Sequence, residues 1–335
     1  MLDPMNNWTN MSYNEIYRGL RYLKIKKRQT RPNLQSTISE LVTEDGCKVY
    51  LVGTVHFSRE SVRDVQQIIQ QVQPDAVVIE LCQDRKLLLT LDEQTLLNEA
   101  KECDLYKMQK AMNQFGVMPA LWLMVFLKLS AYVTEQLGIA PGGEFRKAFR
   151  EAQKIPFCNI YFGDRPIFIT LNRCAATLSF WKLVKMFLGV LCLNSQSVPV
   201  GKEIMEQIKQ KGMLEQTIKT ATEEFPEFHR IFISERDVYL THSLKQAARP
   251  IVLPQISQSD PQQVIPSVVV GVVGIGHVAG IKKNWNRQLN IQELMRVPNP
   301  SLPTRILRFV FGVTLYGLKI FFYYKIAQTL IWLFD

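Results

Sequence analysis

The feature that most constrains the fold is a strand–helix–strand pattern at residues 48–85. A short apolar run at 49–52 is typical of a buried strand. Apolar residues across 62–72 then recur near helical spacing and predict an amphipathic helix. A second apolar run at 76–79 follows. The pattern predicts a βαβ unit, whose two strands are usually parallel.

Chemically active side chains follow the predicted strands. Glu80 closes the second strand, and another buried strand is predicted much later, at 268–273. Gly-x-x-His follows an apolar run twice, ending at His56 and at His277. Carboxyl ends of parallel strands share the edge where α/β sheets bind ligands. Two His and one carboxylate would suit Zn, Mn or Co, although either His could equally be a hydrogen-bonded structural residue.

Composition limits the class of protein. With 335 residues and 47% hydrophobic content, the chain can bury one large core or two smaller ones. The formal net charge of +10 is compatible with nucleic acid, an anionic membrane surface or neither partner, and we favour the membrane surface. No nucleic-acid module is visible, so we predict no nucleic-acid partner. The six Cys are scattered without close pairs, which favours free thiols and a cytosol-facing protein.

The chain divides into three predicted regions. Residues 1–35 form a basic, disordered N-terminal segment, residues 36–297 a single domain, and residues 298–335 a linker and a hydrophobic segment. The strongly basic stretch at 18–31 is either a solvated tail or a membrane-surface or organelle-targeting element. No apolar core of a secretory signal peptide follows it, so we expect no secretory route.

Within the domain, residues 36–47 predict a strand and an Asp-Gly turn that lead as a hairpin into the next strand. Residues 159–172 predict a strand, a turn and a second strand, which Arg165 and Arg173 flank. Arg236, inside a predicted helix, is either a salt-bridge partner or an anion binder. Helices are predicted at residues 87–106, 117–133, 144–149, 177–193, 201–224, 231–248 and 281–295.

The C-terminal stretch at 306–334 is mostly apolar and aromatic, although Lys319 and Lys325 interrupt it. About 20 apolar residues suffice to cross a bilayer. The stretch is a tail anchor with snorkelling Lys, an interfacial helix, or a helix docked on the domain. We favour membrane association.

Several phrases of the chain resemble the TraB family (TraB/PrgY/Tiki-like). They are LVGTVHFS, PDAVVIELCQ, GDRPIFITLNR, SERDVYLT and SVVVGVVGIGHVAGI, which occur in this order across residues 38–297. The resemblance implies an α/β fold with a mixed, largely parallel sheet flanked by helices, akin to the erythromycin-esterase and ChaN-like group. Extra helices and a C-terminal hydrophobic helix complete the expected architecture.

The resemblance also implies a site. His56, His277 and Glu80 would hold a divalent metal, Mn, Co or Zn. Glu80 and four further residues would serve catalysis: Glu235 as general base or further ligand, and Arg236, Arg165 and Arg173 as binders of an oxyanion or a substrate carboxylate. This chain departs from Tiki-like sequences at Asp237, where they carry Asn.

Two functions follow for such a chain. One is a metal-dependent, peptidase-like hydrolase on a cytosol-facing, membrane-anchored domain, with a peptide substrate. The other is a non-catalytic membrane-bound module that binds a protein partner or tethers organelles. Plant relatives resemble tethers of the mitochondrial outer membrane, so we expect that membrane, or otherwise the cytoplasm.

Overall fold

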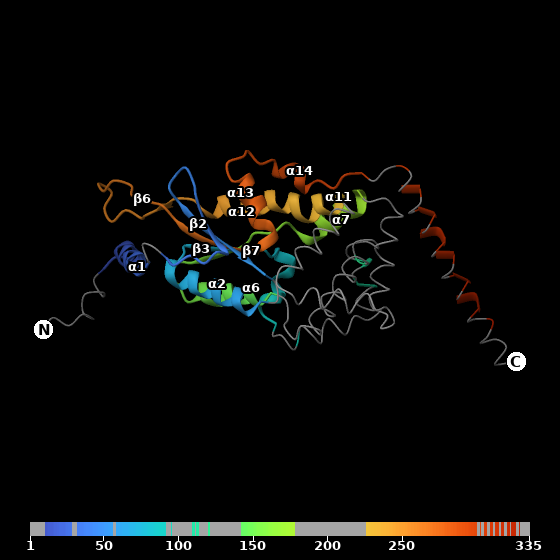
Figure 1. The fold of residues 1–335 in the computed structure, drawn as a ribbon, viewed down its shortest axis with the longest axis horizontal. Coiled ribbons are helices and arrows are strands. Elements are labelled where there is room, and N and C mark those ends of the chain that lie inside the picture. The colour runs from blue at the N-terminus through green and yellow to red at the C-terminus, as the bar shows by residue number, and fades with distance from the viewer. Residues whose placement is uncertain are drawn as a thin grey trace.

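The computed structural model describes residues 11–28, 32–55, 58–91, 142–177 and 226–299, with isolated positions at 95–120 and 302–328. Its centre is a five-stranded sheet in the order β1-β2-β7-β3-β4 (Figure 1). Four strands are parallel, and β1 is antiparallel to β2, so the predicted mixed α/β sheet is confirmed. The strands are β1 (Ile38–Val42), β2 (Lys48–Thr54), β3 (Ala76–Ile79), β4 (Asn159–Phe162) and β7 (Val268–Gly274), and a separate hairpin joins β5 (Ile251–Val252) to β6 (Val264–Ile265).

The strand β7 lies between β2 and β3, which are therefore parallel but not neighbours. Thr54 at the end of β2 pairs with Gly274 at the end of β7, and Ile79 of β3 pairs with Val272. A strand with helices on both faces must be apolar on both sides, and the Val-rich sequence of β7 satisfies this requirement. The two strands that precede the Gly-x-x-His motifs are therefore neighbours.

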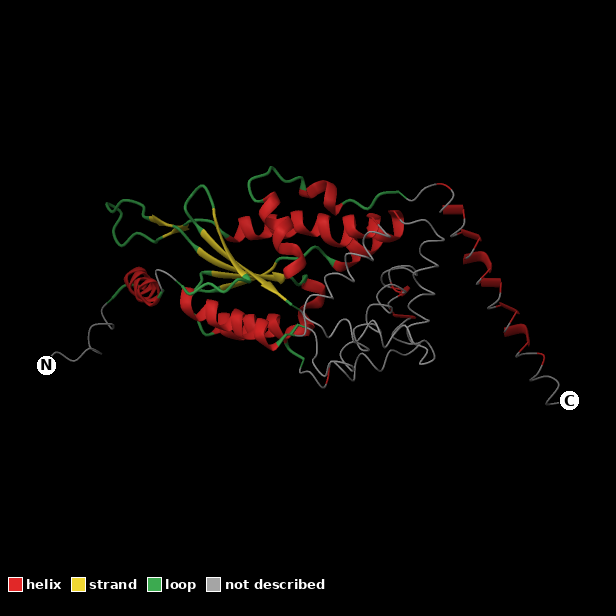
Figure 2. Cartoon of the chain, in the orientation of Figure 1, coloured by secondary structure: helices red, strands yellow, loops and turns green. Residues whose placement is uncertain are grey.

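Helices cover both faces of the sheet (Figure 2). The helices α2 (Arg59–Val72) and α6 (Gly143–Gln153) pack on one face, where Ile68, Ile69 and Ala148 are buried. On the other face, α12 (Glu235–Ala247) and α13 (Ile275–Asn284) bury Leu240, Leu244 and Ile281. The remaining described elements are α1 (Tyr13–Lys27), the 3-10 helix η1 (Gln83–Leu89), α7 (Ile167–Thr177), α11 (Pro226–His229), the π-helix η2 (Arg230–Ser234) and α14 (Ile291–Met295).

Two local predictions are wrong. The second strand expected within 159–172 is the helix α7. The residues of this segment have a composition typical of a strand, but Thr170, Leu171 and Cys174 are buried at helical spacing. Pro166 directly precedes the helix, where its missing N–H costs little. The single helix expected at 281–295 is two helices, α13 and the separate α14. Because α13 begins at Ile275, His277 lies inside this helix and not before it.

The expected N-terminal disorder is also contradicted where the segment is described. Residues 13–27 form α1, which begins with a reciprocal capping box between Ser12 and Glu15. Its basic residues Arg21 and Lys24 are buried because they pair with the carboxylate of Asp75. These two cations therefore belong to neither a solvated tail nor a lipid-binding face.

The predicted helix at 231–248 is confirmed as η2 followed by α12, and the helix at 144–149 as part of α6. The predicted helices at 201–224 and, almost entirely, at 117–133 and 177–193 lie outside the described residues, as does 87–106 beyond residue 91 apart from Thr95. The described positions at 302–328 are helical and exposed. Among the residues that the structure describes, no helix is long and apolar enough to cross a bilayer.

Candidate functional site

Two acidic residues stand at the carboxyl edge of the sheet. Glu80 directly follows β3, and its Oε2 accepts a hydrogen bond from the backbone N–H of Gly274 at 2.6 Å. Asp164 follows β4 after Gly163, and its Oδ1 accepts from the backbone N–H of Arg165 at 2.8 Å. Both carboxylates are buried. Sheet topology therefore places two acids at the edge where ligands of α/β proteins bind.

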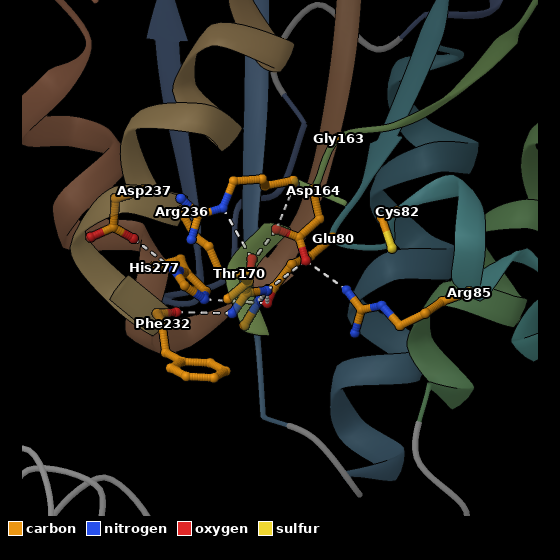
Figure 3. A network of polar contacts seen from close by, with 12 residues as sticks. Glu80, Cys82, Arg85, Gly163, Asp164, Thr170, Phe232, Arg236, Asp237 and His277 are labelled. Atoms are coloured by element: carbon orange, nitrogen blue, oxygen red, sulfur yellow. Dashed lines mark hydrogen bonds and ion pairs between the residues drawn. The ribbon is translucent and has the colours of Figure 1, made fainter. Parts of the chain in front are cut away.

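Arg236 of α12 joins these acids (Figure 3). Its Nε and Nη2 donate to Oδ1 and Oδ2 of Asp164, both at 2.9 Å, and Nη2 also donates to Oε1 of Glu80. Burial lowers the pKa of Arg236, but the charges of Asp164 and Glu80 outweigh it and raise the pKa above its ordinary value. Arg85 of η1 adds a contact from Nη2 to Oδ2 of Asp164 at 2.6 Å.

His277, in the first turn of α13, has both ring nitrogens beside carboxylates. Its Nδ1 lies 2.6 Å from Oδ1 of Asp237, and its Nε2 lies 3.2 Å from Oε1 of Glu80. Burial lowers its pKa, but the charge of Glu80 and the hydrogen bonds with Asp237 and Glu80 outweigh this and raise the pKa to about 9. Figure 3 shows His277 and Asp237 on one side of Arg236 and Arg85 on the other.

A second network surrounds Glu235. Arg165 donates from Nη1 to its Oε2 at 2.7 Å, and Arg173 donates from Nε to Oε2 at 2.7 Å and from Nη2 to Oε1 at 2.8 Å. Burial raises the pKa of Glu235, but the bonds from Arg173 and Arg165 outweigh it and lower the pKa. Both arginines also donate to main-chain carbonyls of α14, at Leu294 and at Glu293. Glu235 is thus already fully engaged.

Three consecutive residues serve different partners. Glu235 reaches Arg165, Arg236 reaches Glu80, and Asp237 reaches His277. This is possible because successive side chains on an α-helix point in directions about 100° apart. The helix α12 continues directly from η2, and π-helical turns often occur at functional sites.

The structure brings three of the predicted site residues together: Glu80, Arg236 and His277. Arg165, Arg173 and Glu235 form the second network, and His56 lies outside the described residues. Sequence reasoning missed the roles of Asp164, Asp237 and Arg85. For Asp164 there was a signal, since it follows a predicted strand as Glu80 does. Within the described part of the chain, no group of three or more His, Cys, Asp or Glu could hold a metal.

Comparison with known proteins agrees with this architecture. The model of the TraB/PrgY/gumN family matches residues 40–289. The chain belongs to this family. It is 53% identical to the mouse TraB domain-containing protein and 52% to its human counterpart, in each case over 309 residues that cover 92% of this chain and 81% of the relative.

A distant relative of this TraB-family chain is archaeal. An uncharacterized protein of Methanocaldococcus jannaschii is 28% identical over 282 residues, which cover 83% of this chain and 64% of the relative. The family match includes both Gly-x-x-His motifs, Glu80 and the helix that carries Arg236. Family membership is therefore shown for the part of the chain that builds the carboxyl edge.

Proposed function

We propose that the chain is a metal-dependent, peptidase-like hydrolase whose ion is held by His277, Glu80 and His56. The observation that carries the proposal is the 3.2 Å separation of Nε2 of His277 from Oε1 of Glu80. Two such ligands on one Zn²⁺-sized ion lie about 3.0 to 3.4 Å apart, given metal–ligand bonds of about 2.1 Å. Asp237 holds the other ring nitrogen, as carboxylates commonly do behind a metal-bound His.

The charge of the network also supports a bound cation. Among the residues that the structure describes, its carboxylates are Glu80, Asp164 and Asp237, and its guanidinium groups are Arg85 and Arg236. A buried excess of negative charge is costly unless a cation compensates it. A proton on His277 or a divalent ion at its Nε2 would each do so. Mn, Co and Zn accept this set of nitrogen and oxygen ligands.

A metal in this place would lower the pKa of a bound water and so supply a nucleophile at neutral pH. Arg236 would keep the carboxylate of Glu80 in position. Arg236, Arg165 and Arg173 are the guanidinium groups proposed to bind a substrate carboxylate or an oxyanion. Glu235 would act as general base only after exchanging one of its two arginine partners, because both of its oxygens already accept hydrogen bonds.

The test is metal analysis of the purified full-length protein together with metal-stimulated cleavage of a peptide library. His277→Ala and His56→Ala should each lose bound metal and cleavage. His242→Ala is the matched control, since His242 lies on α12 but outside the network. Full metal content and cleavage in both site variants would refute the proposal.

A second candidate is a membrane-bound binding or tethering module on the cytosolic face of the mitochondrial outer membrane. It is favoured by large apolar side chains that are exposed at described positions of the C-terminal segment, including Ile306, Phe309 and Tyr316. Deletion of residues 306–335 should then release the protein from membranes, while His277→Ala keeps partner binding. A protein that stays on membranes after the deletion would contradict this candidate.

A further inference from the structure

The ring of His277 is held more tightly at one nitrogen than at the other. The contact from Nδ1 to Asp237 is 2.6 Å, whereas the contact from Nε2 to Glu80 is 3.2 Å. An ionised carboxylate can only accept hydrogen bonds, so the short contact places a proton on Nδ1. Only 4% of His277 and 6% of Asp237 are exposed, so little water can compete for this bond.

Asp237 reaches the ring because its neighbour on α13 is a glycine. A Cβ built at Gly280 would lie 1.9 Å from Oδ2, 2.3 Å from Cγ and 2.9 Å from Cβ of Asp237. The last atom is next to the backbone and cannot swing away, so any larger residue must displace Asp237 itself. By contrast, a Cβ at Gly276 on the same helix would meet nothing within 4 Å.

We infer that Asp237 is a positioning residue that fixes the ring orientation and Nδ1 proton of His277, and that Gly280 is the residue that makes room for it. The consequence for metal binding rests on the proposed function: because Asp237 keeps the proton on Nδ1, the proton that His277 gives up to a metal is the one on Nε2, the nitrogen beside Glu80. A carboxylate behind a metal-bound His typically contributes about 10- to 100-fold in metal affinity.

The experiment compares full-length wild type with Asp237→Asn, Gly280→Ala, their double variant and the control Gly276→Ala. Nitrogen-15 NMR of metal-free protein follows the hydrogen-bonded Nδ1 proton of His277. Competition with a chromophoric chelator measures the affinity for Zn²⁺ and Mn²⁺, and thermal unfolding in chelator measures stability.

The wild type and Gly276→Ala should show the hydrogen-bonded Nδ1 proton, and Asp237→Asn and Gly280→Ala should lose it. Both variants should lose about 10- to 100-fold in metal affinity, and the double variant should lose no more than either single one, because both changes act through one contact. An unchanged Nδ1 signal in folded Asp237→Asn and Gly280→Ala would overturn the inference, as would unchanged metal affinity with only a lower unfolding temperature.

The proton signal separates this inference from the proposed function. If the wild type binds neither metal but its Nδ1 signal depends on Asp237, the proposed function fails and the positioning role stands. If the wild type binds metal and the Nδ1 signal does not depend on Asp237, the positioning role fails and the metal site stands. Should Asp237→Asn fail to fold, Gly280→Ala against Gly276→Ala still decides.

Discussion

The two edges of the sheet hold buried charge clusters of opposite balance. At the amino edge, Asp75 faces three cations from one stretch of chain, Arg21, Lys24 and Arg28, at 2.7, 3.1 and 2.6 Å. At the carboxyl edge, the described carboxylates of Glu80, Asp164 and Asp237 outnumber the described guanidinium groups of Arg85 and Arg236, so a proton on His277 or a bound cation has to supply the balance.

The difference separates a structural cluster from a candidate binding site. The amino-edge cations attach a single helix, α1, to the sheet, and Asp75 is further tied to β7 by the backbone N–H of Val268 at 2.9 Å. An excess of cations there gives no reason to bind a metal. The carboxyl edge brings together side chains from distant parts of the chain, and its excess of acids over arginines favours either a proton on His277 or a bound cation in its place. Charge balance, rather than burial, distinguishes the edges.

The largest effect should come from removing the acid of the amino edge. Asp75→Ala leaves Arg21 and Lys24 buried without their carboxylate, so the free energy of unfolding should fall by about 4 kcal/mol, as measured by denaturant titration. Glu40→Ala is the control, because its pair with Lys48 is exposed and should contribute less than about 1 kcal/mol. Equal losses of unfolding free energy in the two variants would show that the amino-edge cluster does not stabilise the fold.

A smaller but conditional effect is expected at the carboxyl edge. Arg236→Gln removes the cation between Glu80 and Asp164, so in chelator the free energy of unfolding should fall by about 3 kcal/mol. Mn²⁺ or Zn²⁺ should restore part of that loss, about 2.7 kcal/mol at 100 times the dissociation constant. The same ions should not restore the free energy of unfolding of Asp75→Ala. Equal restoration in both variants would show that the two edges do not differ in metal binding.

Much of this contrast follows from sequence. The apolar runs gave the strands, and Gly-x-x-His with Glu80 marked the carboxyl edge, because parallel strands end on the same side. The amino edge could not be predicted in this way, since the pairing of Arg21 with Asp75 spans 54 positions and leaves no local pattern. The basic composition of α1 instead suggested a disordered tail.

The details of the carboxyl edge were less predictable. The β-branched and aromatic residues at 167–170 indicated a strand, but burial of one helical face of α7 decided otherwise. The link from Asp237 to His277 depends on how closely α12 and α13 approach, which Gly280 permits and no periodicity reveals. The placement of a residue at the end of a strand could be predicted from the sequence, whereas the contacts between two helices could not.

The pH dependence of metal-free stability tests the carboxyl edge alone. The pKa of His277 is raised to about 9, above the value of about 6.5 expected in the unfolded chain. Its contribution, about 3 kcal/mol, is therefore complete below about pH 6.5 and is lost as pH rises through about 9. Denaturant midpoints in chelator should fall across this window for the wild type but not for His277→Gln. An identical slope in the variant would assign the titration to another group.

The smallest effect should come from the second network, which lies beside the carboxyl edge but is saturated with hydrogen bonds. Arg173→Lys keeps a positive charge near Glu235 but cannot reproduce both bonds to its carboxylate together with the bond to the carbonyl of Glu293. Because Arg165 still pairs with Glu235 at 2.7 Å, the free energy of unfolding should fall by only about 1 kcal/mol in denaturant titrations. Metal affinity should stay unchanged, since Glu80 and His277 keep all their described partners. A variant that loses metal affinity while remaining folded would join the two networks into one site and assign Glu235 and its arginines to the same chemistry as His277.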